Sequence, residues 1–489
     1  MELDSIVQFF EDKTILVTGS TGFLAKMFVE KILRIQPNVK KLFLLLRGTD
    51  TKSATQRLDD EVVGTELFRV LREKWGANLN SLIAEKVLPV SGDISYEHLG
   101  IKDCDLREEM WREIDIIVNS AATTKFDGRY DVALSINAFG VLHVLNFAKK
   151  CANLKLLLHV STAYVCGERD GLILERPFYM GETLNGATGL DIEAEKKLAE
   201  ETLNDLRAEE ATEKAITLAM KDLGIQRARL YGWPNTYVFT KAMGEMLLIH
   251  LKENLTVVII RPTVITSTYK EPFPGWLEGI RTIDSFGVHY GKGKLTSVLN
   301  DPKSIIDIIP GDMAVNCIIM AIAVHANQPS EIIYHVGSSQ RNPMTYANLQ
   351  DFGFRYFIKN PWIDSNGKLV KVGKLLVFST MASFRFYMAI RYSLPLKVLQ
   401  LVNVALFQHL ESTCLNLNRE TNSMIRLAEL YRPYLFFKGI FDDTNTERLR
   451  MAAEESNVEV DMFYFDPKSV DWEDYFINIH LPGIVKYLF

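Results

Sequence analysis

The 489-residue chain has few cysteines and none of the spacings that would give them a structural role. Its five cysteines are scattered at positions 104, 151, 166, 317 and 414, without a Cys-x-x-Cys pair. This distribution is typical of a reducing compartment and argues against a disulfide framework. It also argues against a zinc site, and we predict no metal site.

The sequence shows neither a basic excess nor a long apolar run, and we expect no leader peptide. Its net charge is −6 and its pI is about 5.9, so we expect no nucleic-acid partner. Acidic residues appear at Glu2 and Asp4 and the first predicted strand begins by Thr14, so we expect neither a secretory signal nor a transit peptide. No uncharged apolar run reaches the ~18–20 residues of a membrane-spanning helix. The nearest candidate, residues 369–407, is interrupted by five lysines and arginines.

The chain does have the pattern of a folded α/β protein. Hydrophobic residues make up 47% of it and aromatic residues 10%, over a length that allows two or three domains. Six short aliphatic runs predict strands at residues 15–17, 41–46, 87–90, 114–118, 156–160 and 257–260, with helical segments between most of them. This alternation predicts an α/β fold with a doubly wound parallel sheet, whose ligands bind at the carboxyl ends of the strands.

The alternation changes twice along the chain. Residues 168–230 are long, charged and helix-rich, and we interpret them as an insertion over the sheet. From about residue 351, apolar-basic and helical segments replace the alternation. We therefore predict a dinucleotide-binding domain over residues 1–350, with the insertion at about 168–230, and a mainly helical domain over residues 351–489.

The most informative stretch is the glycine-rich run after the first predicted strand, KTILVTGSTGFLA at residues 13–25. Gly19 permits a tight turn, and Gly22 lets the backbone approach a pyrophosphate. Ala25 keeps the following helix packed against the strand. The N-terminus of that helix directs partial positive charge at phosphates. The run therefore predicts a dinucleotide site.

Polar residues end the next strands. Arg47 stands where an NAD site usually carries Asp or Glu, and an arginine suits the 2′-phosphate of NADPH. Asp93 follows the third strand, where a carboxylate accepts from an adenine amino group, although a helix N-cap would explain it equally well. Asn119 opens NSAAT after the fourth strand, where small residues let the nicotinamide half lie against the backbone.

A hydroxyl, a phenol and an amine form the candidate catalytic group. Thr162 ends the fifth strand, and Tyr237 and Lys241 share one face of a later helix because they are four residues apart. We expect the ammonium to lower the phenol pKa from its ordinary value of about 10. Thr162 would bond the substrate oxygen, and Lys241 would also hold the nicotinamide ribose. This arrangement suits hydride delivery to a carbonyl with protonation of the oxyanion.

The order of these motifs, from TGSTGFLA through VST and YVFTK to RPT, resembles the extended short-chain dehydrogenase/reductase family. Longer runs resemble the plant-type alcohol-forming fatty acyl-CoA reductases and extend over nearly the whole chain. They are LLR (45–47), AATTKFD (121–127), HVSTAYV (159–165), WPNTYVFTKA (233–242), EPFPGW (271–276), YHVGS (334–338), YLFF (434–437), FDD (441–443) and FDP (465–467).

This resemblance implies a Rossmann-type reductase domain, a C-terminal "sterile" domain, NADPH as cofactor and a long-chain acyl-CoA as substrate. The matching catalytic positions are Thr162, Tyr237 and Lys241. The implied cofactor-binding positions are Gly19, Thr21, Gly22, Phe23, Leu24, Arg47, Asp93, Ile94, Asn119, Ala121, Lys241, Pro262 and Thr263. The implied reaction reduces the thioester through an aldehyde to a primary alcohol and releases CoA, feeding wax, cutin or suberin lipids.

Some alternatives stay open from the sequence. Another extended family member, acting on a sterol or a nucleotide sugar, shares the dinucleotide turn but leaves the insertion and the C-terminal domain unexplained. A dinucleotide sensor without catalysis typically lacks the Tyr237–Lys241 pair. Cys166 lies close enough to Thr162 to consider a covalent thioester route, against the simpler reading of a small buried residue. His159 reads as a core histidine.

The membrane question also stays open. Residues 369–407 fit an interfacial surface and fit the buried face of a helical domain equally well. Because a long-chain alcohol partitions into membranes, we expect the cytosolic face of the endoplasmic reticulum as the location.

Overall fold

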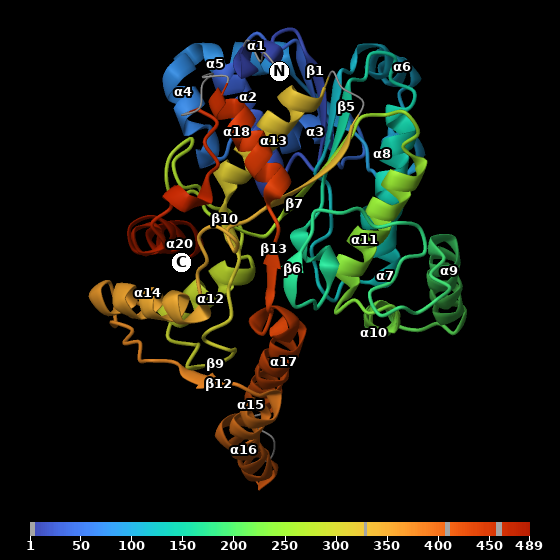
Figure 1. The fold of residues 1–489 in the computed structure, drawn as a ribbon. Coiled ribbons are helices and arrows are strands. Elements are labelled where there is room, and N and C mark those ends of the chain that lie inside the picture. Colours follow the sequence, from blue (N-terminus) through green and yellow to red (C-terminus); the bar gives the residue numbers. More distant parts are fainter. Residues whose placement is uncertain (1–4, 327–329, 406–410, 456–461) are drawn as a thin grey trace.

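The computed structural model describes residues 5–326, 330–405, 411–455 and 462–489. Its centre is a sheet of seven parallel strands in the order β11-β7-β5-β4-β1-β2-β3 (Figure 1). In chain order these strands are β1 (Thr14–Thr18), β2 (Lys41–Leu46), β3 (Val87–Ser91), β4 (Ile116–Asn119), β5 (Leu156–Val160), β7 (Val257–Pro262) and β11 (Glu331–Val336). The order reverses at β1, beside β4, so the carboxyl ends of these two strands form the switch point where dinucleotides bind.

The strands are apolar on both faces because helices cover both faces. In β1, Ile15 and Val17 belong to one core and Leu16 to the other. The first core includes α2 (Phe23–Ile35) and α13 (Gly311–His325), and the second includes α8 (Gly140–Ala148). Helix α11 (Thr236–Leu251) packs against α8, and α18 (Thr444–Glu455) packs against α13 and β11.

Shorter helices complete the N-terminal part and the connections of the sheet. They are α1 (Ile6–Phe9), α3 (Thr51–Leu58), α4 (Arg69–Trp75), α5 (Leu79–Lys86), α6 (Cys104–Glu113), α7 (Tyr130–Leu134) and α12 (Thr282–Gly291). Two short strands, β8 (Val264–Thr266) and β10 (Ile308–Pro310), pair in parallel outside the main sheet.

The predicted insertion contains one short strand and two helices, β6 (Gly171–Ile173), α9 (Ile192–Ala208) and α10 (Glu213–Leu230). The helices pack beside α7 and α11 through an apolar cluster that includes Ile216, Met220 and Trp233. A buried carboxylate ties them together, because Glu195 of α9 accepts from Arg227 of α10 and from the hydroxyl of Tyr130. The insertion is therefore a packed layer at the α11 side of the sheet.

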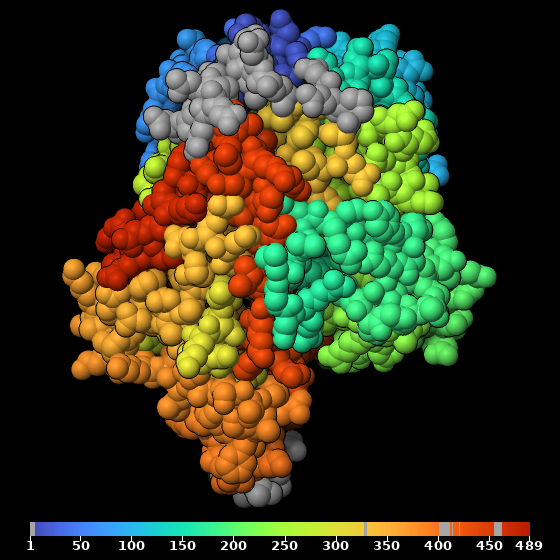
Figure 2. Space-filling model, in the orientation of Figure 1, coloured from blue at the N-terminus to red at the C-terminus, as the bar shows by residue number. Residues whose placement is uncertain are grey.

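The C-terminal region leaves the sheet and then returns to it. Helices α14 (Tyr346–Lys359), α15 (Met381–Met388), α16 (Leu394–Ala405) and α17 (Glu411–Leu435) are followed by α18, α19 (Trp472–Asp474) and α20 (Leu481–Leu488). Helices α15 and α16 extend away from the sheet at the bottom of Figure 1, and the same protrusion is visible in Figure 2. Two short strands tie the region to earlier residues: β12 (Leu376–Phe378) pairs with β9 (Ser297–Leu299), and β13 (Gly439–Phe441) pairs with β6.

Among the described residues, one helical stretch is long and apolar enough to cross a membrane, Tyr130–Ala148. It comprises α7, a π-helical turn at Ser135–Phe139 and α8, and 61% of its apolar window is buried inside the protein. Because it packs against α11 and the sheet, the fold already accounts for its apolar character.

The predicted fold class is confirmed, and the six predicted strands all lie in the sheet. The seventh strand, β11, was not predicted, although it is buried at four of its six positions. The boundary placed at residue 350 stays a prediction.

Candidate active site

The glycine turn lies where β1 meets β4. Gly19 has φ +68°, and a Cβ atom there would lie 2.7 Å from the Cα and N atoms of Ala121. Gly22 is the N-cap of α2 and supplies no side chain to the first-turn amides, so these amides remain for a ligand. Phe23 and Leu24 have buried side chains and offer a ligand mainly their backbone, whereas Thr21 is half-buried.

The residues that follow β2 and β3 differ in how accessible their side chains are to a ligand. Arg47 follows β2 and is exposed. Asp93 is not a helix N-cap: its Oδ1 atom accepts from the backbone N–H and the hydroxyl of Ser95 at 2.9 and 2.8 Å. Ile94 is buried, and its carbonyl oxygen accepts from Nδ1 of His143. Arg47 is therefore an exposed cation at this edge of the sheet.

Asn119 has its side chain committed inside the sheet. The hydroxyl of Thr18 donates to Oδ1 of Asn119 at 2.6 Å, and the same hydroxyl accepts from the backbone N–H of Ala121. The amide nitrogen of Asn119 bonds Nδ1 of His159 at 3.1 Å. At the end of β7, Pro262 is buried and the N–H of Thr263 donates to Val336. Thus Asn119 supports the site through its neighbours.

The three predicted catalytic side chains lie together beyond β5. Thr162 follows this strand, and its side chain shares a hydrogen bond with the phenol of Tyr237. Lys241 lies one helical turn after Tyr237 on α11 and is buried. Its Nζ atom donates to the carbonyl oxygen of Val160 at 2.7 Å and lies 3.2 Å from Nε2 of His159. The helix is positioned by Asn235, whose side chain caps it through the N–H of Val238.

The expected lowering of the phenol pKa is wrong for this structure. Burial raises the pKa of Tyr237 to about 12, and only the hydrogen bond from Thr162 opposes the rise. Lys241 is not among the groups that shift this pKa, and the partners of its amine are Val160 and His159. Burial lowers the pKa of Lys241 to about 8, although the negative charge of Glu245 acts in the opposite direction. At neutral pH the phenol therefore keeps its proton, as a group that donates to an oxyanion must.

A buried polar atom beside this group has no partner among the described residues. The hydroxyl oxygen of Ser161, between β5 and Thr162, makes no hydrogen bond within the protein. A buried hydroxyl normally finds a partner, and an orphan at the carboxyl end of a strand is what a ligand would satisfy. Together with the tight turn at Gly19, which lies against the backbone of Ala121, and the first-turn amides of α2, this orphan hydroxyl fits a nicotinamide dinucleotide.

With this geometry in place, similarity to known proteins identifies the family. Two family models, both described as male sterility protein, match residues 17–318 and 391–489. An alcohol-forming fatty acyl-CoA reductase of Simmondsia chinensis is 57% identical over 100% of this chain and 99% of its own length. Fatty acyl-CoA reductase 1 of Arabidopsis thaliana is 55% identical over 99% and 98%. The chain belongs to the fatty acyl-CoA reductase family.

Solved structures show the same fold at low identity. The terminal R domain of the myxalamid biosynthetic pathway has a TM-score of 0.58 and 16% identity, and the match covers 97% of the reductase and 91% of that chain. UDP-glucuronic acid 4-epimerase from Bacillus cereus, solved with NAD, has a TM-score of 0.51 and 13% identity, with 97% and 99% covered. The second family model matches the C-terminal region. The alternative of an enzyme for a sterol or a nucleotide sugar gave no account of that region.

An aromatic cluster joins the C-terminal region of the reductase to α11, the helix that carries Tyr237 and Lys241. Phe126 stacks on Tyr237, with ring centroids 6.0 Å apart, and contacts Tyr431 and Tyr434 of α17 at 5.1 and 5.0 Å. The side-chain amide of Asn235 donates to the hydroxyl of Tyr434 at 2.7 Å. In the sequence, Phe126 and Tyr434 stood out only as members of the runs AATTKFD and YLFF, which carry the family resemblance. Nothing in their spacing indicated that the two rings meet.

The thiol of Cys166 is unsuited to a covalent route. It is 5% exposed, and burial raises its pKa to about 12, whereas the nucleophile must be a thiolate. Trp276 and Phe273 do not contact the catalytic group: Trp276 stacks on Phe23 at 4.9 Å, and Phe273 packs against Arg69. They form a packed turn beside α2.

A second group of side chains, of the Ser-His-Asp type that can activate a nucleophile, is closed off from solvent. Ser267 lies 3.0 Å from Nδ1 of His480, whose Nε2 lies 3.5 Å from Asp284. All three residues are at most 2% exposed, and burial lowers the pKa of His480 to about 3. The hydroxyl of Ser267 also bonds Tyr475, so this Ser-His-Asp set ties the C-terminal helices to β8 and α12.

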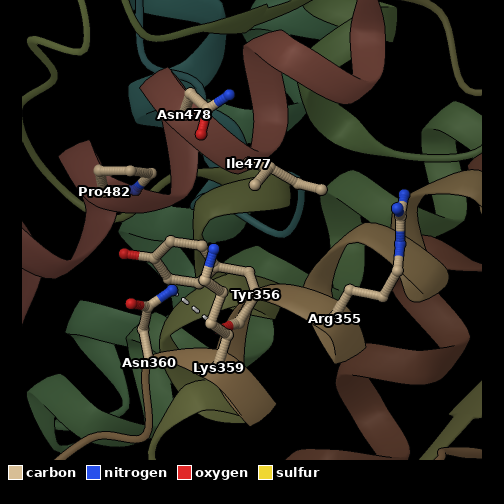
Figure 3. A pocket seen from close by; sticks show the side chains of 7 residues that line it. All are labelled: Arg355, Tyr356, Lys359, Asn360, Ile477, Asn478 and Pro482. Carbon is tan, nitrogen blue, oxygen red and sulfur yellow. Dashed lines mark hydrogen bonds between the residues drawn. The ribbon is translucent and has the colours of Figure 1, made fainter.

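A surface pocket of about 470 Å³ lies between α14 and the start of α20 (Figure 3). Seven residues line it: Arg355, Tyr356, Lys359, Asn360, Ile477, Asn478 and Pro482. None belongs to the predicted site. Arg355 is already paired with Asp351 and Glu473, so its charge is compensated within the protein.

Proposed function

We propose that this reductase converts a long-chain fatty acyl-CoA through an aldehyde to a primary alcohol, with NADPH as reductant. The observation that carries the proposal is the meeting of Thr162, Tyr237 and Lys241 at the carboxyl end of β5, on the edge of the parallel sheet where β1 runs into the glycine turn. The names of the full-length relatives supply the substrate class, since they are fatty acyl-CoA reductases. Each of the two steps consumes one NADPH and one proton, and the first also releases CoA as a thiol.

The protein residues act on the carbonyl oxygen in both steps. When bound at the glycine turn, the cofactor supplies hydride to the carbonyl carbon. The hydroxyls of Thr162 and Tyr237 stabilise the oxyanion as it forms, which is usually the largest catalytic contribution. In the first step the tetrahedral species collapses and the C–S bond breaks. In the second step Tyr237 gives its proton to the alkoxide, and its raised pKa keeps that proton available at neutral pH.

We assign NADPH on the position of Arg47. Its exposed guanidinium follows β2, the strand whose end meets the adenosine ribose in this fold. A guanidinium can pair with a 2′-phosphate through two hydrogen bonds, whereas an NAD site places a carboxylate there.

The decisive experiment is Tyr237→Phe. We expect this variant to lose reduction of both acyl-CoA and aldehyde while it still binds NADPH, because the lost hydroxyl serves the substrate oxygen. Tyr179→Phe is the matched control, since Tyr179 is 61% exposed on the insertion. Full residual activity of Tyr237→Phe would refute the assignment. Acyl-CoAs of graded length, with alcohols and aldehydes separated by chromatography, would define the substrate and show whether aldehyde escapes.

The same proposal places the enzyme on a membrane surface, as expected for the cytosolic face of the endoplasmic reticulum. Four apolar side chains spaced four residues apart along α15, the π-helical turn Ala389–Ser393 and α16 are 53–69% exposed: Phe386, Ile390, Leu394 and Val398. The sequence has six lysines and arginines and no acidic residue between Asp364 and Glu411. Of residues 369–407, 406 and 407 lie outside the described residues.

An exposed apolar stripe with cationic flanks fits an anionic lipid surface. Burying the exposed half of four such side chains would contribute roughly 3–6 kcal/mol, at about 1.5–3 kcal/mol for each whole side chain. Flotation with vesicles of phosphatidylcholine and phosphatidylserine tests this docking. Phe386→Ser/Ile390→Ser should abolish flotation. Leu218→Ser/Leu230→Ser on α10, with similar exposure, should not. Equal flotation of the first pair and the wild type would overturn the membrane proposal.

A further inference from the structure

Four polar side chains form one buried row that ends at the catalytic lysine. Thr18, Asn119 and His159 are aligned by strand register, because Thr18 is the Cα partner of Asn119 and Asn119 is the Cα partner of His159. Lys241 of α11 closes the row at Nε2 of His159. All four are at most 1% exposed, so no solvent competes for their hydrogen bonds.

The proton positions along this row follow from its first member. The hydroxyl of Thr18 already accepts from Ala121, and its single proton goes to Oδ1 of Asn119. The amide face of Asn119 that meets His159 is therefore the NH₂ group, which only donates. Nδ1 of His159 must then be the acceptor, and a neutral imidazole carries its proton on Nε2.

An Nε2–H group that faces Lys241 needs a lone pair on Nζ. An amine offers that lone pair and an ammonium does not. The row therefore stabilises the uncharged lysine, and protonation of Lys241 breaks the contact with His159. The other bond of Nζ, to the carbonyl oxygen of Val160, is available to both forms.

We propose that His159 is a positioning residue for the reduction, which holds the uncharged amine of Lys241 and thereby sets the pH at which this lysine takes up its proton. This inference rests on the proposed nicotinamide-dependent reduction. It assigns a role to a histidine that, from its position in an apolar strand, is expected only to fill the core.

Few other charged groups among the described residues bear on Lys241. Glu245 lies one turn further along α11 and favours the charged amine, but it is paired with Arg261 of β7. Tyr237, one turn earlier, is bonded to Thr162. On α8, His143 bonds the carbonyl oxygen of Ile94. Burial lowers the pKa of Lys241 to about 8, in the same direction as the effect of the row.

The test reads NADPH binding against pH, without acyl-CoA, from the change in NADPH fluorescence. In the wild type we expect an inflection near pH 8. His159→Leu removes the bond to the neutral amine, so the inflection should rise by about half to one pH unit, the worth of one hydrogen bond. His159→Gln retains an N–H donor, so its inflection should rise less than that of His159→Leu.

Asn119→Asp supplies a second and nearly isosteric perturbation. A carboxylate only accepts, so Nδ1 of His159 must donate to it and Nε2 becomes an acceptor for the ammonium. The inflection should rise further than in His159→Leu, with the fold checked by circular dichroism. If neither variant moves the inflection, the positioning role is refuted. If the wild type binds NADPH with this pH dependence but reduces no acyl-CoA, the proposed function fails, whereas the effect of His159 on the protonation of Lys241 stands.

Discussion

The buried ion pair between Glu245 and Arg261 gives the sharpest prediction. It joins α11, the helix of Tyr237 and Lys241, to β7, and the side chains of Glu245 and Arg261 are 0% and 3% exposed. The Nε atom of Arg261 donates to Oε1 of Glu245 at 3.0 Å, and its Nη2 atom donates to Oε2. Removing one partner of such a pair leaves an uncompensated buried charge and costs about 3–5 kcal/mol. Glu245→Gln should cost about 3 kcal/mol, the lower end, because the amide oxygen still accepts one hydrogen bond.

Urea denaturation followed by tryptophan fluorescence measures this loss as a difference in the free energy of unfolding. Glu429→Gln is the matched control, since it breaks the exposed pair with Arg385 and should cost less than about 1 kcal/mol. Adding Arg261→Gln to Glu245→Gln should recover part of the loss, because no isolated charge remains. A cost for Glu245→Gln no larger than for Glu429→Gln would refute the account of a dry, fully engaged pair.

The same substitution also changes the pH dependence. The negative charge of Glu245 favours the ammonium of Lys241, which is charged below a pKa of about 8 and neutral above it. Without that charge the pKa falls, so the inflection in NADPH binding should move to lower pH. This shift is opposite in sign to the one expected for His159→Leu, and a shift in the same direction would contradict the argument.

Three further predictions follow from the site. Arg47→Asp should reduce kcat/KM with NADPH far more than with NADH, and equal losses would remove the case for a 2′-phosphate partner. Iodoacetamide at neutral pH should label the exposed Cys104 first and leave activity intact, since burial raises the pKa of the Cys166 thiol to about 12; inactivation that tracks labelling of Cys166 would revive the covalent route. Tyr434→Phe removes the acceptor of the Asn235 amide and should lower the unfolding free energy by about 1 kcal/mol, as measured by denaturation, and an unchanged stability would mean that this bond contributes nothing.

The sequence predicted the features that are local. Strands such as residues 156–160 are short aliphatic runs, and the turn at Gly19 follows from a residue that must lie against another backbone. The contacts of His159 could not be predicted from the local sequence. Its partners Asn119 and Lys241 lie 40 and 82 positions away and meet it only through strand register and helix packing. The phenol pKa was mispredicted for a related reason. Burial is a property of the whole fold, and it outweighed the effect expected from the spacing of Tyr237 and Lys241.

The hydrogen bond from Asn235 to Tyr434 has a consequence for protein engineering. The side-chain amide of Asn235 caps α11 and also donates to Tyr434 in the last turn of α17. The two regions matched by separate family models are therefore connected through one side chain. A chimaera that takes its C-terminal region from a relative would bring a new α17 and, with it, new neighbours for Phe126, the ring that stacks on Tyr237. We therefore expect altered turnover in such a hybrid, unless the residue at 434 and its ring neighbours were carried over unchanged.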